Sequence, residues 1–151
     1  MKNPLLINVK IVSEECSTKE FVLYLLNELQ VSTTKQLYNY FVFDRQLSFA
    51  RFKNLLVELQ KEQLVQCVST YKGTREKAYF LSKKGRRFIQ SRYSLPDVTQ
   101  LIVLQKILLL NDVLLQVIHW CFNRKVPILS LITEAQASAD TFFEESEEPR
   151  G

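Results

Sequence analysis

The apolar residues between positions 48 and 87 change their spacing once, from a helical to an alternating pattern. Large apolar side chains first recur every three or four residues, at Phe52, Leu55, Leu56 and Leu59. This spacing is typical of the buried face of an amphipathic helix. The segments 65–71 and 77–81 are then β-branched or aromatic and roughly alternating, which predicts two strands joined by a short turn that contains Gly73. The pattern therefore predicts a helix followed by a β-hairpin.

Two more helices are predicted before this stretch. Ser17 is followed three residues later by Glu20, the form of a capping box, and a helix is expected from there to about Gln30. Its buried side chains are predicted to be Phe21, Leu25, Leu26 and Leu29. A start signal at residues 32–34 precedes a second helix, whose apolar face consists of Leu37, Tyr38, Phe41 and Val42. A turn then leads to Ser48, which is expected to cap the third helix.

Helical signals also follow the hairpin. Ser82 can cap a short fourth helix over residues 83–89. Pro96 and Asp97 predict the start of a long, very apolar helix that reaches Asn123, because proline suits the first turn and aspartate complements the helix dipole. Six polar residues argue against a membrane span there: Gln105, Lys106, Asn111, Asp112, Gln116 and His119. A break at 124–127 precedes a last amphipathic helix with Ile128, Leu131, Ile132, Ala135, Ala139 and Phe142 on one face.

Basic residues are concentrated in the middle of the 151-residue chain. Residues 33–93 contain 13 Lys and Arg against 4 Asp and Glu, whereas the rest of the chain contains 7 basic and 12 acidic residues. This asymmetry favours a polyanionic partner, because lysine and arginine displace counterions from phosphates. A solubilising basic surface is the alternative. The three cysteines, Cys16, Cys67 and Cys121, have no paired spacing, which indicates reduced thiols and a cytoplasmic protein.

Three helices, a basic-tipped hairpin and a fourth helix form the layout of a winged helix-turn-helix. We therefore expect a mainly α fold with a small β-hairpin, followed by a long C-terminal dimerisation helix. Residues 1–16 are predicted to form an N-terminal arm or edge strand, and residues 17–93 a winged-helix DNA-binding domain. Residues 94–143 are predicted to form a helical dimerisation region, and residues 144–151 an acidic disordered tail.

The third helix is the natural recognition helix for the major groove of double-stranded DNA. Candidate base contacts lie on this helix and in the turn before it: Arg45, Gln46, Ser48, Arg51 and Asn54. Arginine suits guanine and asparagine suits adenine, while Lys35 and Lys53 are expected to contact phosphates. The hairpin and the fourth helix extend the basic surface with Lys72, Arg75, Lys77, Lys83, Lys84, Arg86 and Arg87. For any single residue among these, a solvated position without a ligand is the alternative.

Three segments carry a family resemblance, and their sequences are TTKQL at 33–37, RFKNLLVEL at 51–59 and AYFLSKKGR at 78–86. They resemble the winged-helix region of replication-relaxation proteins of bacterial plasmids and mobile elements, and more loosely MarR and PadR regulators. LNDV at 110–113 resembles a short motif that follows the hairpin in the first family. The resemblance implies sequence-specific DNA binding, by a regulator of transcription or a factor in plasmid or mobile-element replication or maintenance. Residues 61–63 depart from it, since such proteins usually place a glycine there.

The long apolar helix predicts a homodimer. Seven residues with alternating spacings of three and four form the expected seam: Leu101, Leu104, Leu108, Asn111, Leu115, Ile118 and Phe122. Asn111 would face its symmetry mate and fix the register of the two helices. A second row is expected to pack on the winged helix of the same chain: Val103, Ile107, Leu110, Leu114 and Val117. A two-fold dimer predicts an inverted-repeat DNA site, and the alternative is that both rows pack within one subunit.

Residues for catalysis or for a metal are sparse. His119 is the single histidine and is expected to be a partly buried packing residue. The chain has no Cys-x-x-Cys pair and no glycine-rich phosphate loop, so neither an enzyme nor a cofactor is expected. The alternative function is a winged-helix protein-interaction module in a replication or mobilisation complex. Its candidate aromatic contacts are Tyr38, Tyr40, Phe43 and Phe49.

Overall fold

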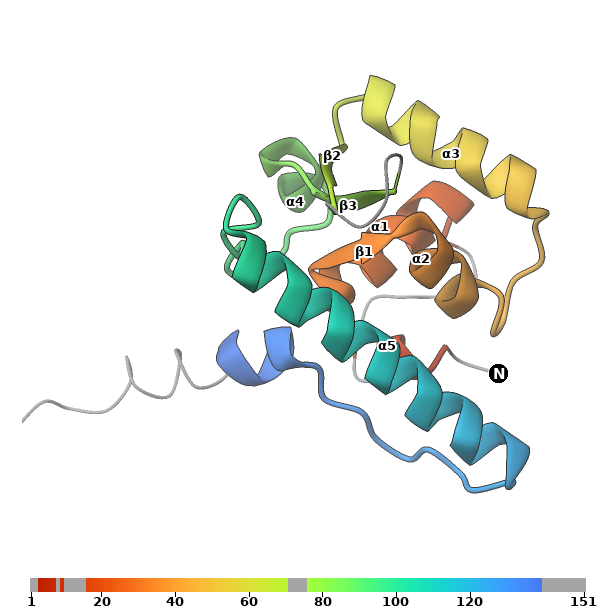
Figure 1. The fold of residues 1–151 in the computed structure, drawn as a ribbon. Helices are drawn as coiled ribbons and strands as arrows, with labels where there is room; N and C mark the ends of the chain where they lie inside the picture. Colours follow the sequence, from red (N-terminus) through yellow and green to blue (C-terminus); the bar gives the residue numbers. More distant parts are fainter. Residues whose placement is uncertain (1–2, 8, 10–15, 71–75, 140–151) are drawn as a thin grey trace, which may run out of the picture.

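The computed structural model describes residues 3–7, 9, 16–70 and 76–139, and within them the chain is mainly helical with one small antiparallel sheet (Figure 1). The elements follow in the order η1 (Pro4–Leu6), α1 (Thr18–Leu29), β1 (Val31–Thr33), α2 (Thr34–Phe41), α3 (Phe49–Lys61), β2 (Val65–Ser69), β3 (Lys77–Leu81), α4 (Lys83–Phe88) and α5 (Leu101–Asn123). Residues 134–139 are also helical. The mainly α fold with a small β component is therefore confirmed.

Four helices begin where the capping residues predict. The side-chain oxygens of Ser17, Thr33, Ser48 and Ser82 each accept the backbone N–H three residues further on, at 3.0–3.2 Å. At Thr33 the capping box is complete, because the Gln36 side chain also accepts the backbone N–H of Thr33. These caps satisfy N–H groups that a helix leaves without internal partners, so the starts of α1 to α4 are set locally.

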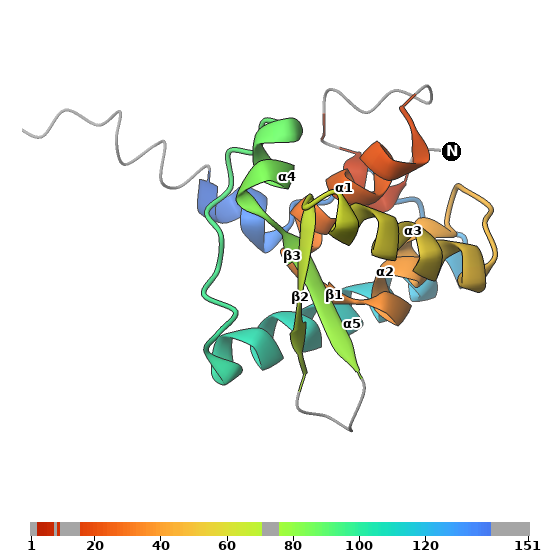
Figure 2. The ribbon, with the colours of Figure 1, turned by 90° about the horizontal axis from the view of Figure 1, so that it is seen from above.

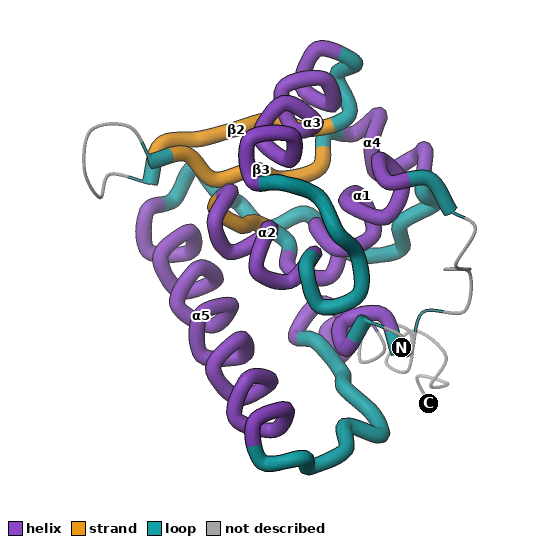
Figure 3. The backbone as a smooth tube through the Cα atoms, turned by 90° about the vertical axis from the view of Figure 1, so that its right-hand side faces the viewer, coloured by secondary structure: helices purple, strands orange, loops and turns teal. Residues whose placement is uncertain are grey.

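The sheet has the strand order β1-β3-β2, and helices cover both of its faces. One face, with Val65, Tyr79 and Leu81, packs into the core formed by α1, α2 and α3. The opposite face, with Val31, Ala78 and Phe80, packs on α5. Figures 1 and 3 show the strands between α3 and α5. The pattern at residues 31–33 indicated only a helix start, so β1 is an element that the sequence analysis missed.

The row of α5 that was predicted to form a dimer seam is instead buried within the chain. Its central members pack on the sheet and on the helical core: Leu104, Leu108, Asn111, Leu115 and Ile118. The Asn111 Nδ2 donates to the backbone oxygens of Leu29 and Val31, at 3.2 and 2.7 Å. Asn111 therefore does not face a symmetry mate. At the ends of the row, Leu101 is exposed and Phe122 stacks on Phe43 with 5.1 Å between ring centroids.

The second row of α5 is only partly internal. Ile107 is buried, and Val103 and Leu114 are half-buried against the core. Leu110 and Val117 are exposed, so the prediction that the whole row packs on the same chain is wrong.

Within the described part of the chain, the helix Leu101–Asn123 is long and apolar enough to cross a membrane, judged by its length and composition alone.

Two predicted helix boundaries differ from the structure. The long helix begins at Leu101, because Asp97 accepts hydrogen bonds from Thr99 and Gln100 and so forms a turn. The last helix does not begin near Ile128, since residues 126–133 are irregular. At the N-terminus, Leu5 and Leu6 are fully buried in η1, so this part of the expected arm is firmly packed. The acidic tail at 144–151 lies outside the described residues.

The end of α3 explains the missing glycine. Gln63 follows the helix with φ = 62°, and the Leu64 N–H donates to the Leu59 carbonyl across the last turn at 3.0 Å. This is a Schellman motif, in which glycine is the usual residue at the positive-φ position. Gly85 of α4 packs against the same junction, and a Cβ at this position would overlap the carbonyl oxygen of Leu64.

A buried carboxylate ties the chain after α5 to α1. Glu28 accepts hydrogen bonds from the Tyr93 and Thr133 hydroxyls, both at 2.7 Å, and from Gln136 Nε2 at 3.1 Å. Burial raises the pKa of the Glu28 carboxyl, and these hydrogen bonds offset the increase only in part. The ionised form is thus destabilised in the folded protein relative to the unfolded chain.

We expect Asn111→Leu to lower the free energy of unfolding. The substitution keeps the number and branching of the side-chain heavy atoms but removes the amide that donates to the Leu29 and Val31 carbonyls. Leaving a buried polar group without its partner costs about 1–3 kcal/mol. Urea denaturation followed by circular dichroism measures this decrease, which should not depend on protein concentration. A variant as stable as wild type would contradict the role given to Asn111.

Glu28→Gln should change how stability depends on pH. Because the folded-state pKa of Glu28 lies above the unfolded value of about 4.3, the folded state retains a proton that the unfolded chain loses. The wild-type free energy of unfolding therefore falls as the pH rises from below that value through the folded pKa. The variant lacks this titration, so its stability relative to wild type should increase over this window. Denaturation at several pH values tests this, and a difference independent of pH would refute it.

Candidate nucleic-acid interface

The buried residues of α3 fix which of its polar side chains point outward. Phe52, Leu56 and Leu59 face the core. At 3.6 residues per turn, Asn54 lies opposite this row, and Arg51 and Lys53 lie on opposite flanks of the helix. All three of these polar residues are exposed.

Contacts to neighbouring elements identify the two flanks. On the Arg51 side, Glu58 lies 3.5 Å from the Nζ of Lys19 in α1. On the Lys53 side, Gln60 Nε2 donates to the Cys67 sulfur of β2 at 3.5 Å. Lys53 is therefore on the hairpin side of α3, whereas Arg51 is on the side of α1.

The starts of α2 and α3 meet the loop end of the hairpin and the middle of α5 in one concave pocket of about 580 Å³. Lys35, Asn39, Phe49 and Lys77 line it, and the Lys53 Nζ lies 5.1 Å from the centroid of the Phe49 ring. We call these five residues the basic face. Two acidic residues also line the pocket, Glu76 and Asp112. The Asp112 carboxylate accepts a hydrogen bond from Gln36 at 2.6 Å.

Arg45 is held by the protein itself. Its Nη2 donates to the Cys16 carbonyl at 3.0 Å, and its guanidinium lies 4.2 Å from the centroid of the Phe21 ring. The Arg45 side chain therefore fastens the α2–α3 turn to α1, and its role in reading bases stays a prediction. Gln46 and Ser48 are exposed, and the Ser48 hydroxyl caps α3.

The basic residues of α4 do not join the basic face. Figure 2 shows α4 after one end of β3, while Lys77 begins the other end. The Lys84 Nζ donates to the Glu62 carbonyl at the end of α3, at 3.0 Å, and Arg86 donates to the Tyr93 carbonyl. These two side chains thus have internal partners. Lys83 and Arg87 are exposed.

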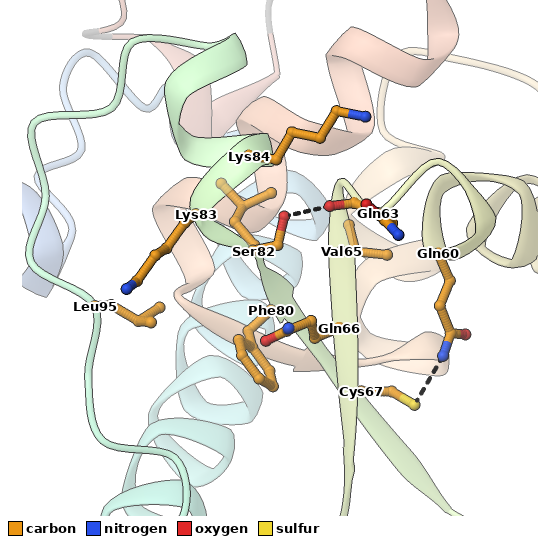
Figure 4. A pocket seen from close by; sticks show the side chains of 11 residues that line it. Gln60, Gln63, Val65, Gln66, Cys67, Phe80, Ser82, Lys83, Lys84 and Leu95 are labelled. Carbon is orange, nitrogen blue, oxygen red and sulfur yellow. Dashed lines mark hydrogen bonds between the residues drawn. The ribbon is translucent and has the colours of Figure 1, made fainter.

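Lys83 lines a separate pocket of about 740 Å³ beside β2 (Figure 4). The pocket wall is formed mainly by amide and apolar side chains: Gln60, Gln63, Val65, Gln66, Cys67, Phe80, Leu81, Ser82 and Leu95, with Lys84 beside them. The predicted DNA contacts are therefore divided between two surfaces. Lys72 and Arg75 lie outside the described residues.

Three of the four aromatic residues expected on a protein-binding surface are used within the fold. Tyr40 is fully buried, and its hydroxyl donates to the Asn111 carbonyl at 2.6 Å. The Tyr38 hydroxyl donates to the Leu47 carbonyl at 2.8 Å, and Phe43 stacks on Phe122. Phe49 is exposed and belongs to the basic face. Burial therefore removes Tyr40 from the candidate aromatic contacts, whereas Tyr38 and Phe43 are half-buried.

His119 is exposed rather than partly buried, and its ring lies 5.3 Å from that of Phe43. Within the described ranges, no three His, Cys, Asp or Glu residues gather as metal ligands. Asn39 is a pocket residue that the sequence analysis missed. Its spacing of four residues from Lys35 on a predicted helix could have identified it.

No family model matches this sequence, and no curated protein or solved structure is significantly similar to it.

Proposed function

We propose that the chain is a winged-helix protein that binds double-stranded DNA. The order of elements supports this, because β1 lies between α1 and α2 and pairs with the second strand of a hairpin that follows α3. In this arrangement α2 and α3 form the helix-turn-helix, α3 enters the major groove, and the β2–β3 hairpin is the wing.

The observation that carries the proposal is the geometry of the basic face. Lys35, Lys53 and Lys77 come from three different elements and converge where α2, α3 and the hairpin meet. Phosphates bound there would be contacted from both the helices and the hairpin. Asn54, on the outer face of α3, is the leading candidate for reading a base, since asparagine pairs with the edge of adenine.

The positive φ at Gln63 also supports the resemblance to replication-relaxation proteins, because it occupies the place where those proteins usually have glycine. We therefore propose that the protein regulates transcription, or acts in replication or maintenance of a plasmid or mobile element, in the cytoplasm. A protein-interaction module has less support, since Tyr38, Tyr40 and Phe43 make internal contacts.

Salt dependence tests binding through the basic face. A preferred site is first selected from random duplex DNA, and dissociation constants are then measured by fluorescence anisotropy across a salt series. Lys53→Ala combined with Lys77→Ala should weaken binding and flatten the slope of log K against log salt by about 0.9 for each phosphate that is no longer neutralised. The matched control is Arg92→Ala, an exposed basic residue after α4 and outside the basic face, which should leave the slope unchanged. A wild-type affinity for DNA that does not depend on salt would refute the proposal.

Base reading by α3 predicts a different result. Asn54→Ala should cost about 1–3 kcal/mol on the selected site and relax the preference at one base pair, with little change on random duplex. Arg51→Ala is the comparison, because Arg51 lies on the flank towards α1 and should cost less on the selected site. Competition binding with a library of single-base variants measures both effects. Equal decreases in affinity for selected and random DNA would remove Asn54 from base recognition.

A further inference from the structure

The outer side of α5 carries an apolar stripe that Lys106 interrupts between Ile102 and Leu109. Its members and their exposed fractions are Ile102 at 82%, Leu109 at 64%, Val113 at 48%, Val117 at 52% and Trp120 at 51%. At 3.6 residues per turn they lie on the side of the helix opposite the buried row that contains Asn111. Lys106 and Arg124 fall on the same side, near the two ends of the stripe.

This surface is as large as the largest apolar patch on a typical monomer, and such patches are often functional. If each large apolar side chain exposes roughly 150–200 Å² when fully free, the stripe presents on the order of 500 Å² of apolar area. Apolar patches of a few hundred Å² often mark interfaces, and a standard interface buries about 800 Å² on each partner. The stripe with its polar rim is therefore of the size that one helix contributes to a stable pair.

We propose that this stripe, and not the predicted row through Asn111, binds a second copy of the chain. The two α5 helices pair antiparallel about a two-fold axis at Val113. Positions equally distant from Val113 then meet, so Leu109 packs on the second copy's Val117 and Lys106 lies over the second copy's Trp120. The spacing along the stripe, mostly of three and four residues, is that of paired helices.

The charges on the stripe fit this occupant. A lysine over a tryptophan ring makes a favourable cation–π contact, and Trp120 already takes part in one, with the Arg124 guanidinium 4.9 Å from its centroid. At the other end, the Lys106 Nζ lies 3.5 Å from Glu134, so this cation has a partner at the rim of the interface. The polar ends and apolar centre match the usual composition of an interface.

A lipid bilayer fits the same stripe less well. An α5 that spanned the bilayer would place Lys106 within the hydrocarbon, at considerable cost. If α5 spanned the membrane, the hydrogen bonds from Asn111 to Leu29 and Val31 would also have to break. A second copy requires neither change.

The pairing also predicts how two copies would bind DNA. This prediction rests on the proposed function, whereas the dimer itself does not depend on DNA binding. Leu109 belongs to the stripe and also lines the pocket of the basic face. The two basic faces would therefore lie on either side of the same two-fold axis. The preferred DNA site should then be an inverted repeat.

Light scattering tests the dimer directly. At tens of micromolar, wild type should have twice the mass of the 17.7 kDa chain. Val113→Lys should be a folded monomer, because the pair would bury two unpaired charges at its axis. The matched control is Val57→Lys on α3, where the valine is 44% exposed, and this variant should remain a dimer. Monomeric wild type would overturn the proposal, and so would a dimeric Val113→Lys.

Disulfide trapping tests the antiparallel arrangement without disrupting the interface. Val113→Cys should form an interchain disulfide, because the two copies of this position meet at the axis. Ile102→Cys should not, since 22 helical residues at 1.5 Å each put its two copies roughly 33 Å apart. Wild type, with its free Cys16, Cys67 and Cys121, provides the background. Trapping at position 102 but not at 113 would overturn the antiparallel arrangement. Sedimentation with anionic phospholipid vesicles tests the lipid alternative. Wild type that is monomeric and sediments with the vesicles would assign the stripe to lipid.

Discussion

One amide, that of Asn111, joins α5 to the turn through which the chain enters the sheet. After α1 the chain turns through Gln30, whose φ of 68° directs it into β1. This turn leaves the carbonyls of Leu29 and Val31 to be satisfied by a group from elsewhere, and Asn111 donates to both. A three-residue strand has little stability of its own, so β1 requires both its pairing with β3 and this contact with α5. The position of α2, which begins directly after β1, follows from the same contact.

Elements with local signals could be predicted from the sequence. Ser48 and Ser82 cap their helices through backbone groups three residues away, so the information lies within one turn. β1 could not be predicted in this way, because it is defined by pairing with residues 78–80, more than forty positions further on. Asp97 shows that a local signal can also be satisfied differently, since its carboxylate accepts from Thr99 and Gln100 and closes a turn instead of starting a helix.

The candidate site was predictable in its region but not in its composition. An excess of lysine and arginine located the basic part of the chain, yet charge alone does not reveal internal hydrogen-bond partners. Arg45 and Lys84 bind carbonyls of Cys16 and Glu62, which are 29 and 22 positions away. Spacing along α5 has the same limitation. It correctly indicated that the row through Asn111 is buried, but it could not indicate whether the covering surface belongs to the same chain or to a second one.

Leu64 joins three elements through its backbone. Its N–H closes the end of α3, its carbonyl accepts the N–H of Ser82 at 3.1 Å, and Gly85 of α4 packs directly against that carbonyl. The end of α3, the start of β2 and the start of α4 consequently share one rigid joint. The helix α3 and a hairpin joined to it in this way cannot tilt independently of each other. If they contact one duplex together, the cost of adaptation falls on the DNA, whose bending energy depends on its sequence. The mechanical stiffness of this joint would then contribute to selectivity at base pairs that no side chain contacts.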